Sequence, residues 1–190
     1  MSTETVTATP VATGSYTIDP THSRIGFVAR HAMVTKVRGS FNEFAGSGYF
    51  DADNPANSHL ELTIQTASID TRNADRDSHM RGNDFFDMDN YPTITFVSTA
   101  VEADSDSVYR VTGGLTIKGV TKPVTVEFEL AGTAVDPFGN TRLGLDGSVV
   151  VNRKDWGVTW NAALEAGGVL VSDKVTLEFE VSAIKATDNA

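Results

Sequence analysis

Large apolar side chains alternate with polar ones along almost the whole chain. The alternation is clear in residues 24–30, 60–66, 109–118 and 124–130, where apolar residues occupy every second position. A period of two is typical of a β-strand with one face against an apolar interior and the other in water. The apolar face includes Ile25, Phe27, Leu62, Ile64, Tyr109, Val111, Val124, Val126 and Phe128. The pattern therefore predicts an all-β protein.

Eight strands follow from the alternation and from the turns between them. Gly and Pro residues in segments 118–123 and 136–140 indicate tight turns. Long antiparallel strands with one apolar face can close into a ring without exposed edges, and about eight strands enclose room for side chains or one small ligand. We expect an extended eight-stranded antiparallel lipocalin-like barrel, with a two-sheet sandwich as the alternative. The predicted strands are residues 15–31, 35–50, 58–69, 92–102, 107–118, 121–135, 140–152 and 172–185.

Two segments interrupt the alternation. In residues 72–91, Asn73 can cap a short helix that runs to Met80 or Arg81 and ends at Gly82, which places a helix between strands three and four. Residues 153–171 hold both tryptophans, and an unsupported loop of that length is uncommon in a compact domain. We expect a structured loop there, and each segment can close one end of a barrel.

Composition narrows the classes of function. A chain of 190 residues fits one domain, and it holds no apolar run near the roughly 20 residues of a membrane-spanning helix. Its 15 Lys and Arg against 25 Asp and Glu give a net charge of -10, which disfavours nucleic acid and anionic membranes as partners. The chain has no cysteine, so disulfides and thiolate chemistry are excluded.

The first fourteen residues lack the basic start and the apolar stretch of a secretory signal. We therefore expect a cytoplasmic protein without membrane insertion. The expected organisation is a disordered tail over residues 1–14, a barrel domain over 15–185 and a flexible C-terminus over 186–190.

Several separate motifs stand in a characteristic order, and together they resemble the YceI-like family. They are YTIDPTHSRIGFVARHAM, SIDTRNADRDSHMRGNDFFDMDNYPTITFVST, YRVTGGLTIKGVTKPVTVEFEL and NRKDWGV, within residues 16–183. The resemblance implies a lipocalin-like barrel, a helix between strands three and four, an elongated apolar tunnel and pairing as a homodimer. It also implies a ligand such as an isoprenoid quinone, a polyprenyl diphosphate or another long-chain amphiphile. The lack of a signal peptide departs from the many periplasmic members.

A tunnel for such a chain needs apolar walls, since each CH₂ hidden from water contributes about 0.8 kcal/mol. We expect one continuous cavity, and plain core packing is the alternative for each wall residue. Phe85, Phe86 and Met88 follow the predicted helix and can line or plug one end. The full set of predicted tunnel residues is Phe27, Phe41, Phe44, Leu62, Ile64, Phe85, Phe86, Met88, Phe96, Leu115, Ile117, Leu143, Leu145 and Trp156.

A polar head group would need hydrogen-bond donors near an opening. The candidates are His22, Ser23 and Arg24 near the start of the first strand, and Asn152 and Arg153 at the end of the seventh. A structural role is the alternative for each of them, with Arg153 pairing with Asp155 or another carboxylate to hold the long loop.

No metal, cofactor or catalytic site is predicted. Asp75 and His79 share a helix face, but two ligands are too few, and acids in a first helical turn are favoured by the helix dipole. Residues 51–55 lack the Gly and Glu that a calcium loop requires, and none of the common catalytic motifs is present.

We therefore expect a non-enzymatic protein that binds, stores or transports a long-chain isoprenoid or similar amphiphile. One alternative is an isomerase or hydrolase that uses the same cavity, with His22, His31 or Asp70 as general base. Another is an interaction module whose barrel is closed and dry.

Overall fold

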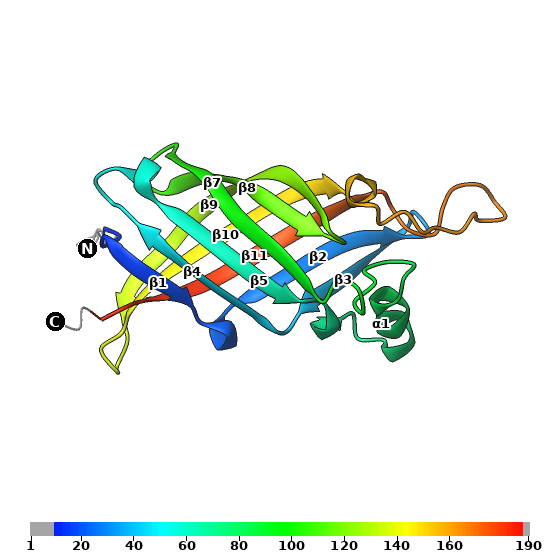
Figure 1. Ribbon diagram of the computed structural model, residues 1–190, viewed down its shortest axis with the longest axis horizontal. Helices are drawn as coiled ribbons and strands as arrows, with labels where there is room; N and C mark the ends of the chain where they lie inside the picture. The colour runs from blue at the N-terminus through cyan, green and yellow to red at the C-terminus, as the bar shows by residue number, and fades with distance from the viewer. Residues whose placement is uncertain (1–9, 188–190) are drawn as a thin grey trace, which may run out of the picture.

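The chain folds into an elongated β-barrel with one short α-helix beside one end (Figure 1). The structure is a computed structural model that describes residues 10–187. Its strands are β1 (Gly14–Ile18), β2 (Arg24–His31), β3 (Thr35–Phe41), β4 (Phe44–Phe50), β5 (His59–Gln65), β6 (Ile69–Asp70), β7 (Thr93–Ala103), β8 (Val108–Ile117), β9 (Val120–Val135), β10 (Thr141–Asn152) and β11 (Lys174–Lys185). The helix α1 spans Ala74–Arg81.

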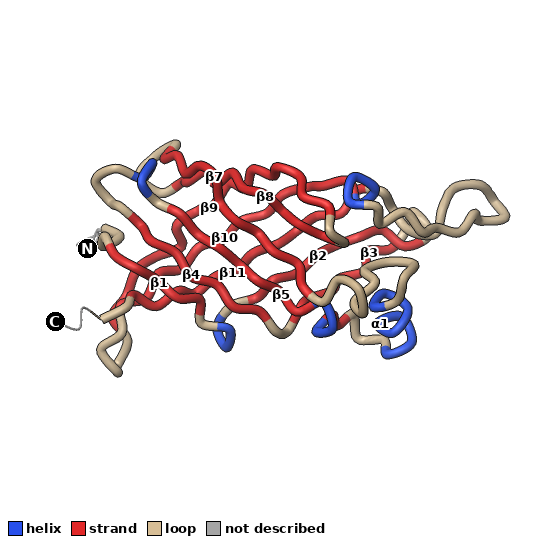
Figure 2. The backbone as a smooth tube through the Cα atoms, in the orientation of Figure 1, coloured by secondary structure: helices blue, strands red, loops and turns tan. Residues whose placement is uncertain are grey.

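The sheet closes on itself. Antiparallel neighbours follow the order β1-β4-β5-β7-β8-β9-β10-β11, and β11 pairs back onto β1 through Tyr16 and Lys185. The short strands β2, β3 and β6 lengthen this wall, because β2 pairs with β11 and β3, and β6 pairs with β3. The strands cross the long axis obliquely as they wind around it (Figure 2). The predicted closed eight-stranded barrel is confirmed, and the sandwich alternative is wrong.

Three of the predicted strands are broken by short turns. A 3-10 turn at Pro20–His22 separates β1 from β2, residues 42–43 separate β3 from β4, and a second 3-10 turn at Thr66–Ser68 separates β5 from β6. The same hairpin continues across the first break, since Tyr16 pairs with Gly48 on one side and Ile25 with Phe41 on the other. A strand this long must bend to follow the barrel wall, and the breaks provide the bends.

The helix begins and ends where its capping residues predict. The Asn73 side chain accepts a hydrogen bond from the Arg76 backbone N–H at 2.9 Å, and Gly82 follows the last helical residue. Asp77 is buried and accepts the Thr71 backbone N–H at 2.8 Å, which ties the first turn to the segment after β6. The predicted helix between the third and fourth strands of the barrel is confirmed. No helix within residues 10–187 is long and apolar enough to cross a membrane.

The two ends of the barrel differ. The chain termini and the β9–β10 hairpin lie at one end, which we call the termini end (Figure 1). The helix α1 and the long loop after β10 lie at the other, which we call the helix end. Val11 packs at the termini end against Tyr16, Leu143 and Ala183. Val11, from the expected tail, thus covers this end of the barrel, while residues 1–9 and 188–190 lie outside the described part.

Phenylalanine rings cover glycines of neighbouring strands. Phe27 stands opposite Gly39 and Phe128 opposite Gly147, and a Cβ at either glycine would overlap the ring opposite it, with Phe128 Cδ1 at 2.7 Å from a Cβ at Gly147. Phe96 lies on Gly113 in the same way. Because these glycines face the interior without a side chain, the rings lie along the wall and leave the centre of the barrel less filled.

We predict that a methyl group at these glycines destabilises the barrel. Gly39→Ala and Gly147→Ala should each lower the free energy of unfolding by about 1–3 kcal/mol, because a phenylalanine ring must turn away from the wall. Urea denaturation followed by circular dichroism measures the change. Gly132→Ala in β9 is the matched control, since its Cβ would meet nothing within 4 Å. Equal effects at all three sites would contradict this account of the rings.

An ion-pair cluster ties the β1–β2 break to the β9–β10 turn. Arg142 donates from Nη1 to Asp19 Oδ2 and from Nε to Asp136 Oδ2, both at 2.8 Å. The Arg142 guanidinium, with Thr21 and His22, holds the pKa of Asp19 well below its usual range, and Arg142 likewise holds down the pKa of Asp136. A carboxyl whose pKa is depressed on folding adds stability above its unfolded pKa of about 4 and loses that contribution as pH falls toward the folded value.

We predict that this cluster contributes to the acid sensitivity of the fold. Between about pH 4 and pH 2, the wild type should lose more stability than Arg142→Met, in which both carboxyl pKa values return toward normal. Urea midpoints at pH 7 and pH 3 measure the difference. Arg110→Met is the control, because Arg110 also pairs with two carboxylates, Glu102 and Asp104, at an exposed site. Parallel pH profiles for the wild type and Arg142→Met would count against the cluster.

Candidate ligand-binding cavities

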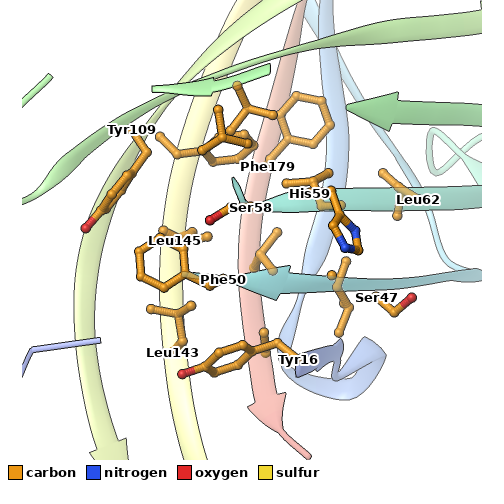
Figure 3. Close-up of a pocket in the computed structure, with 18 of the residues that line it drawn as sticks. Tyr16, Ser47, Phe50, Ser58, His59, Leu62, Tyr109, Leu143, Leu145 and Phe179 are labelled. Atoms are coloured by element: carbon orange, nitrogen blue, oxygen red, sulfur yellow. The ribbon is translucent and has the colours of Figure 1, made fainter. Parts of the chain in front are cut away.

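Two apolar cavities lie end to end inside the barrel. The termini-end cavity has a volume of about 160 Å³ and the helix-end cavity about 130 Å³. Figure 3 shows the first, with Leu143, Leu145 and Phe179 among the apolar side chains that converge on it. Cavities of this size with apolar walls can stay free of water and bind apolar molecules. The walls are the inward-facing positions of the strands, as the alternating pattern predicts.

A waist of five side chains separates the two cavities. Each belongs to a different strand and lines both cavities: Ile25, Leu62, Phe96, Val126 and Phe179. The sequence predicted one continuous tunnel, and the structure has two cavities that share these wall residues from β2, β5, β7, β9 and β11.

Aromatic side chains cover the helix-end cavity. Phe85 and Phe86 follow α1 and line this cavity together with Met80 of the helix. Trp156 is buried, and its Nε1 donates to the Leu115 carbonyl of β8 at 2.9 Å. The indole therefore satisfies its one polar group on the barrel wall and presents apolar surface to the cavity.

Arg153 is the charged side chain in the wall of the helix-end cavity, and its hydrogen bonds are internal. Nε donates to Ser172 O at 2.9 Å, and Nη1 donates to Val158 O at 2.7 Å and Trp160 O at 2.9 Å. Burial lowers the pKa of Arg153, and the nearby Asp173 carboxylate opposes that shift. The expected loop-holding role of Arg153 is present, with carbonyls and Asp173 as partners instead of Asp155.

Two tyrosines lie at the margin of the termini-end cavity. Tyr16 and Tyr109 contribute to its wall, and Figure 3 shows the hydroxyls of both at the margin of the apolar group. Tyr16 Oη donates to Ala12 O at 2.7 Å. Burial raises the pKa of Tyr109, and the Asp106 carboxylate raises it further, so the phenol stays neutral at this mouth.

The predicted tunnel residues fall mainly on these walls. Phe44 and Met88 lie outside the walls of both cavities, because Phe44 is packed in the core and Met88 lies in the turn after α1. The remaining residues line one cavity or both: Phe27, Phe41, Leu62, Ile64, Phe85, Phe86, Phe96, Leu115, Ile117, Leu143, Leu145 and Trp156. Their contact with a ligand stays a prediction.

Most head-group candidates lie away from the cavities. His22 bonds to Asp19, Ser23 Oγ donates to Ser182 O, and Asn152 accepts from Lys154 N as the cap of a 3-10 turn. Arg24 donates to Gly39 O and stands 3.6 Å from Glu178. Of the five candidates, Arg153 alone contributes to a cavity wall. The other four form hydrogen bonds with other residues of the chain, away from the cavities.

Some wall residues were part of the alternating pattern but were not chosen as site residues. They are Tyr16, Val126, Phe128, Val149, Val151, Val175, Leu177, Phe179 and Val181. The alternation itself could have identified them, since it places all of them on the inner face.

The residues required by the enzyme hypothesis are elsewhere. His22 lies outside the barrel in the Pro20–His22 turn, His31 is exposed at the end of β2, and Asp70 accepts from Arg72 N and Asn42 Nδ2. None of the three contributes to the described walls of either cavity. His79 bonds to Asp84 rather than sharing a site with Asp75, and no group of three metal-binding side chains occurs within residues 10–187.

Comparison with known proteins finds related sequences and solved structures with the same fold. A UPF0312 protein of Pseudomonas aeruginosa is 42% identical over 154 residues, which cover 80% of both chains. The crystal structure of Burkholderia cenocepacia BcnA superposes with a TM-score of 0.77 at 29% identity and covers 90% of this chain and 99% of that one. A polyisoprenoid binding domain from Saccharophagus degradans shares the fold at 16% identity, with a TM-score of 0.68 over 90% of this chain and 98% of that one.

A protein-family model also matches this sequence. It is the model of the YceI-like domain, and it matches residues 16–183, which include every strand of the closed ring except the outermost residues of β1 and β11. The motifs and the barrel agree with that match, and this chain therefore belongs to the YceI-like domain family.

Proposed function

We propose that this protein binds a long-chain isoprenoid, or a similar amphiphilic lipid, without catalysing a reaction on it. The observation that carries the proposal is the pair of apolar cavities that share a waist of five side chains. Each cavity alone suits a small apolar molecule, but together they line most of the length of the barrel. A flexible chain that displaces the waist side chains can occupy both and bury many CH₂ groups at about 0.8 kcal/mol each.

Related proteins motivate the choice of an isoprenoid. The Saccharophagus degradans domain is described as polyisoprenoid binding and has the same fold. The bore of the present chain is lined by Leu, Ile, Val and Phe side chains, which suit a branched apolar chain. The residues of the enzyme alternative lie outside the cavity walls, which supports binding over catalysis.

The polar groups of the cavities favour an uncharged head group. Arg153 donates to backbone carbonyls, so its guanidinium has no pair of free N–H groups with which to bind a diphosphate. The termini-end cavity lies near the Asp106 carboxylate, which acts on the wall residue Tyr109, and carboxylates repel anions. The Tyr109 hydroxyl suits a neutral quinone or alcohol, while Tyr16 already donates to Ala12 O, so of the expected ligands we favour the quinone over the diphosphate.

We also propose that the protein acts in the cytoplasm as a homodimer, as expected from the sequence and the family resemblance. Analytical ultracentrifugation of the full chain tests the dimer, and cell fractionation tests the location. Sedimentation as a monomer across the micromolar range would exclude a stable dimer.

We predict that a bulky ring at the waist separates long ligands from short ones. Leu62→Trp should abolish binding of solanesol, which must pass the waist, and should change binding of geraniol by less than about threefold. The substitution costs about 1–3 kcal/mol if the site is fully packed, and less where cavities adjoin it. Native mass spectrometry after exchange with each alcohol measures occupancy.

Thr63→Trp is the matched control for Leu62→Trp, because Thr63 is the next residue of β5 and faces outward. A folded Leu62→Trp protein that retains solanesol would contradict passage through the waist. Ile64→Trp and Leu115→Trp narrow the helix-end cavity instead, and they keep the test informative if Leu62→Trp does not fold.

We predict that the protein prefers a neutral head group. Farnesol should bind at least about tenfold more tightly than farnesyl diphosphate, because the diphosphate would lose its hydration without gaining a free cation. Quenching of tryptophan fluorescence, with Trp156 in the cavity wall, measures both affinities. Tighter binding of the diphosphate would overturn the assignment of the head group and leave the apolar bore intact.

A further inference from the structure

An apolar tip projects from the helix end of the barrel. It consists of Met33 and Val34 in the β2–β3 turn and Val169 in the loop after β10, with side chains 64%, 73% and 37% exposed. The exposed Ala163 and Ala166 lie in the same loop. Figure 1 shows this loop extending beyond the ends of β2 and β3, on the side of the molecule opposite the termini. Large apolar side chains gathered on one projection commonly mark an interaction site.

The turn and the loop form one unit. The Ala32 backbone N–H donates to Leu170 O at 2.8 Å, and His31 forms a bridge with Val171. Met33 Sδ lies so close to Gly168 that a Cβ there would approach it to 2.5 Å. The apolar tip is therefore held in place from two segments of the chain that are far apart in sequence.

The turn accepts backbone strain in order to present these side chains. Ala32 and Met33 have φ of 50° and 62°, the left-handed region in which two-residue hairpin turns normally use Asn and Gly. Met33 is nevertheless largely in water, so burial does not compensate the strain within this chain.

Cations stand directly behind the apolar tip, and one of them, Arg30, donates from Nη1 to Val34 O at 3.2 Å. Arg30 and Lys36 face each other across the β2–β3 hairpin, a like-charge pairing that costs stability in a sheet. Both are exposed, and neither has a carboxylate partner in the described part of the chain. Lys174, at the start of β11, is also exposed. Glu165 in the loop and Asp173 beside Lys174 are opposing charges close by, and Asp173 is paired with Lys154 at 3.2 Å. This basic collar of Arg30, Lys36 and Lys174 therefore keeps an excess of positive charge.

The apolar tip is close to the helix-end cavity. Val171, the bridge partner of His31, lines that cavity, and so do Ala29 of β2 and Val158 of the same loop. A surface that receives the tip would therefore lie next to the cavity mouth.

From these features we infer that the apolar tip docks on the surface of an anionic lipid bilayer. Met33, Val34 and Val169 would enter the interfacial region while the basic collar contacts lipid phosphates, the arrangement by which peripheral proteins bind membranes. The role of this contact rests on the proposed function, because it would bring the cavity mouth to the source or destination of the lipid. The contact is peripheral and involves no spanning segment.

The net charge of -10 does not oppose such docking, because the charge is unevenly placed. Glu102, Asp104 and Asp106 cluster around the β7–β8 hairpin, near the termini-end cavity. The helix end also carries acids in and after α1, such as Asp75, Asp84 and Asp87, so the positive charge is local to the basic collar. An anionic surface would attract the basic collar and repel the acidic β7–β8 hairpin.

Vesicle flotation with the full chain tests the docking. The protein should float with phosphatidylglycerol vesicles at low ionic strength, and weakly or not at all with phosphatidylcholine vesicles. Arg30→Gln with Lys36→Gln should weaken binding by about 25-fold, at about fivefold for each cation. Met33→Ser, Val34→Ser and Val169→Ser together should reduce binding at least about tenfold.

Phe138→Ser is the matched control, because Phe138 is an 88% exposed apolar side chain in a turn at the opposite end. It should leave flotation unchanged. Absence of flotation in the wild type, or flotation lost in Phe138→Ser and kept in the triple variant, would overturn the inference. The triple variant could instead become a monomer where the wild type is a dimer, with unchanged flotation. That result would also overturn the inference, because the apolar tip would then contact a second copy of the chain and not a bilayer.

A ligand assay on the same proteins separates this inference from the proposed function. The triple variant should bind farnesol from detergent as the wild type does, since none of its three substituted residues lines a cavity. Flotation without any ligand binding would refute the proposed function and leave the docking standing. Ligand binding without flotation would refute the docking and leave the proposed function standing.

Discussion

Closure of the sheet through β11 is the constraint on which the rest of this structure depends. β11 pairs with β10 on one side. On its other side it pairs with β1 and β2, the two strands into which the first predicted strand is broken. That double pairing joins the last strand to the first and removes the open edges of the sheet. A closed ring of eight strands fixes the width of the interior, and every inward side chain must then be accommodated within that width.

The way this width is filled creates the cavities. Where Phe27, Phe96 and Phe128 lie on glycines of neighbouring strands, the rings take space from the wall instead of the centre. Ile25, Leu62 and Phe179 lie where the two cavities adjoin and line both of them. The binding space is thus a consequence of which small and large residues share a level of the barrel. A ligand that crosses the waist would have to move side chains, while the backbone ring stays as it is.

Polar side chains in this protein serve mainly to hold the ends of the barrel. Arg153 fastens the long loop through backbone carbonyls, and Arg142 fastens the β9–β10 turn to the break between β1 and β2. A buried guanidinium must use its donors, because leaving them unsatisfied costs more than the contacts gain. This structural use of cations leaves the bore apolar.

The sequence by itself determined the strands and the helix, because each depends on local pattern. The alternation also favoured a closed barrel over a sandwich, but closure itself is the pairing of β1 with β11, at opposite ends of the chain. Alternation placed the inner face, Asn73 and Gly82 bounded the helix, and the glycine and proline turns separated the strands. The tertiary structure alone decided which inward residues border empty space. Phe44 and Leu62 both face inward, yet Phe44 is packed and Leu62 lines two cavities, since the difference depends on neighbours from distant strands. The partners of Arg153 and the meeting of Met33 with Gly168 likewise depend on contacts between segments far apart in the chain, which no local pattern encodes.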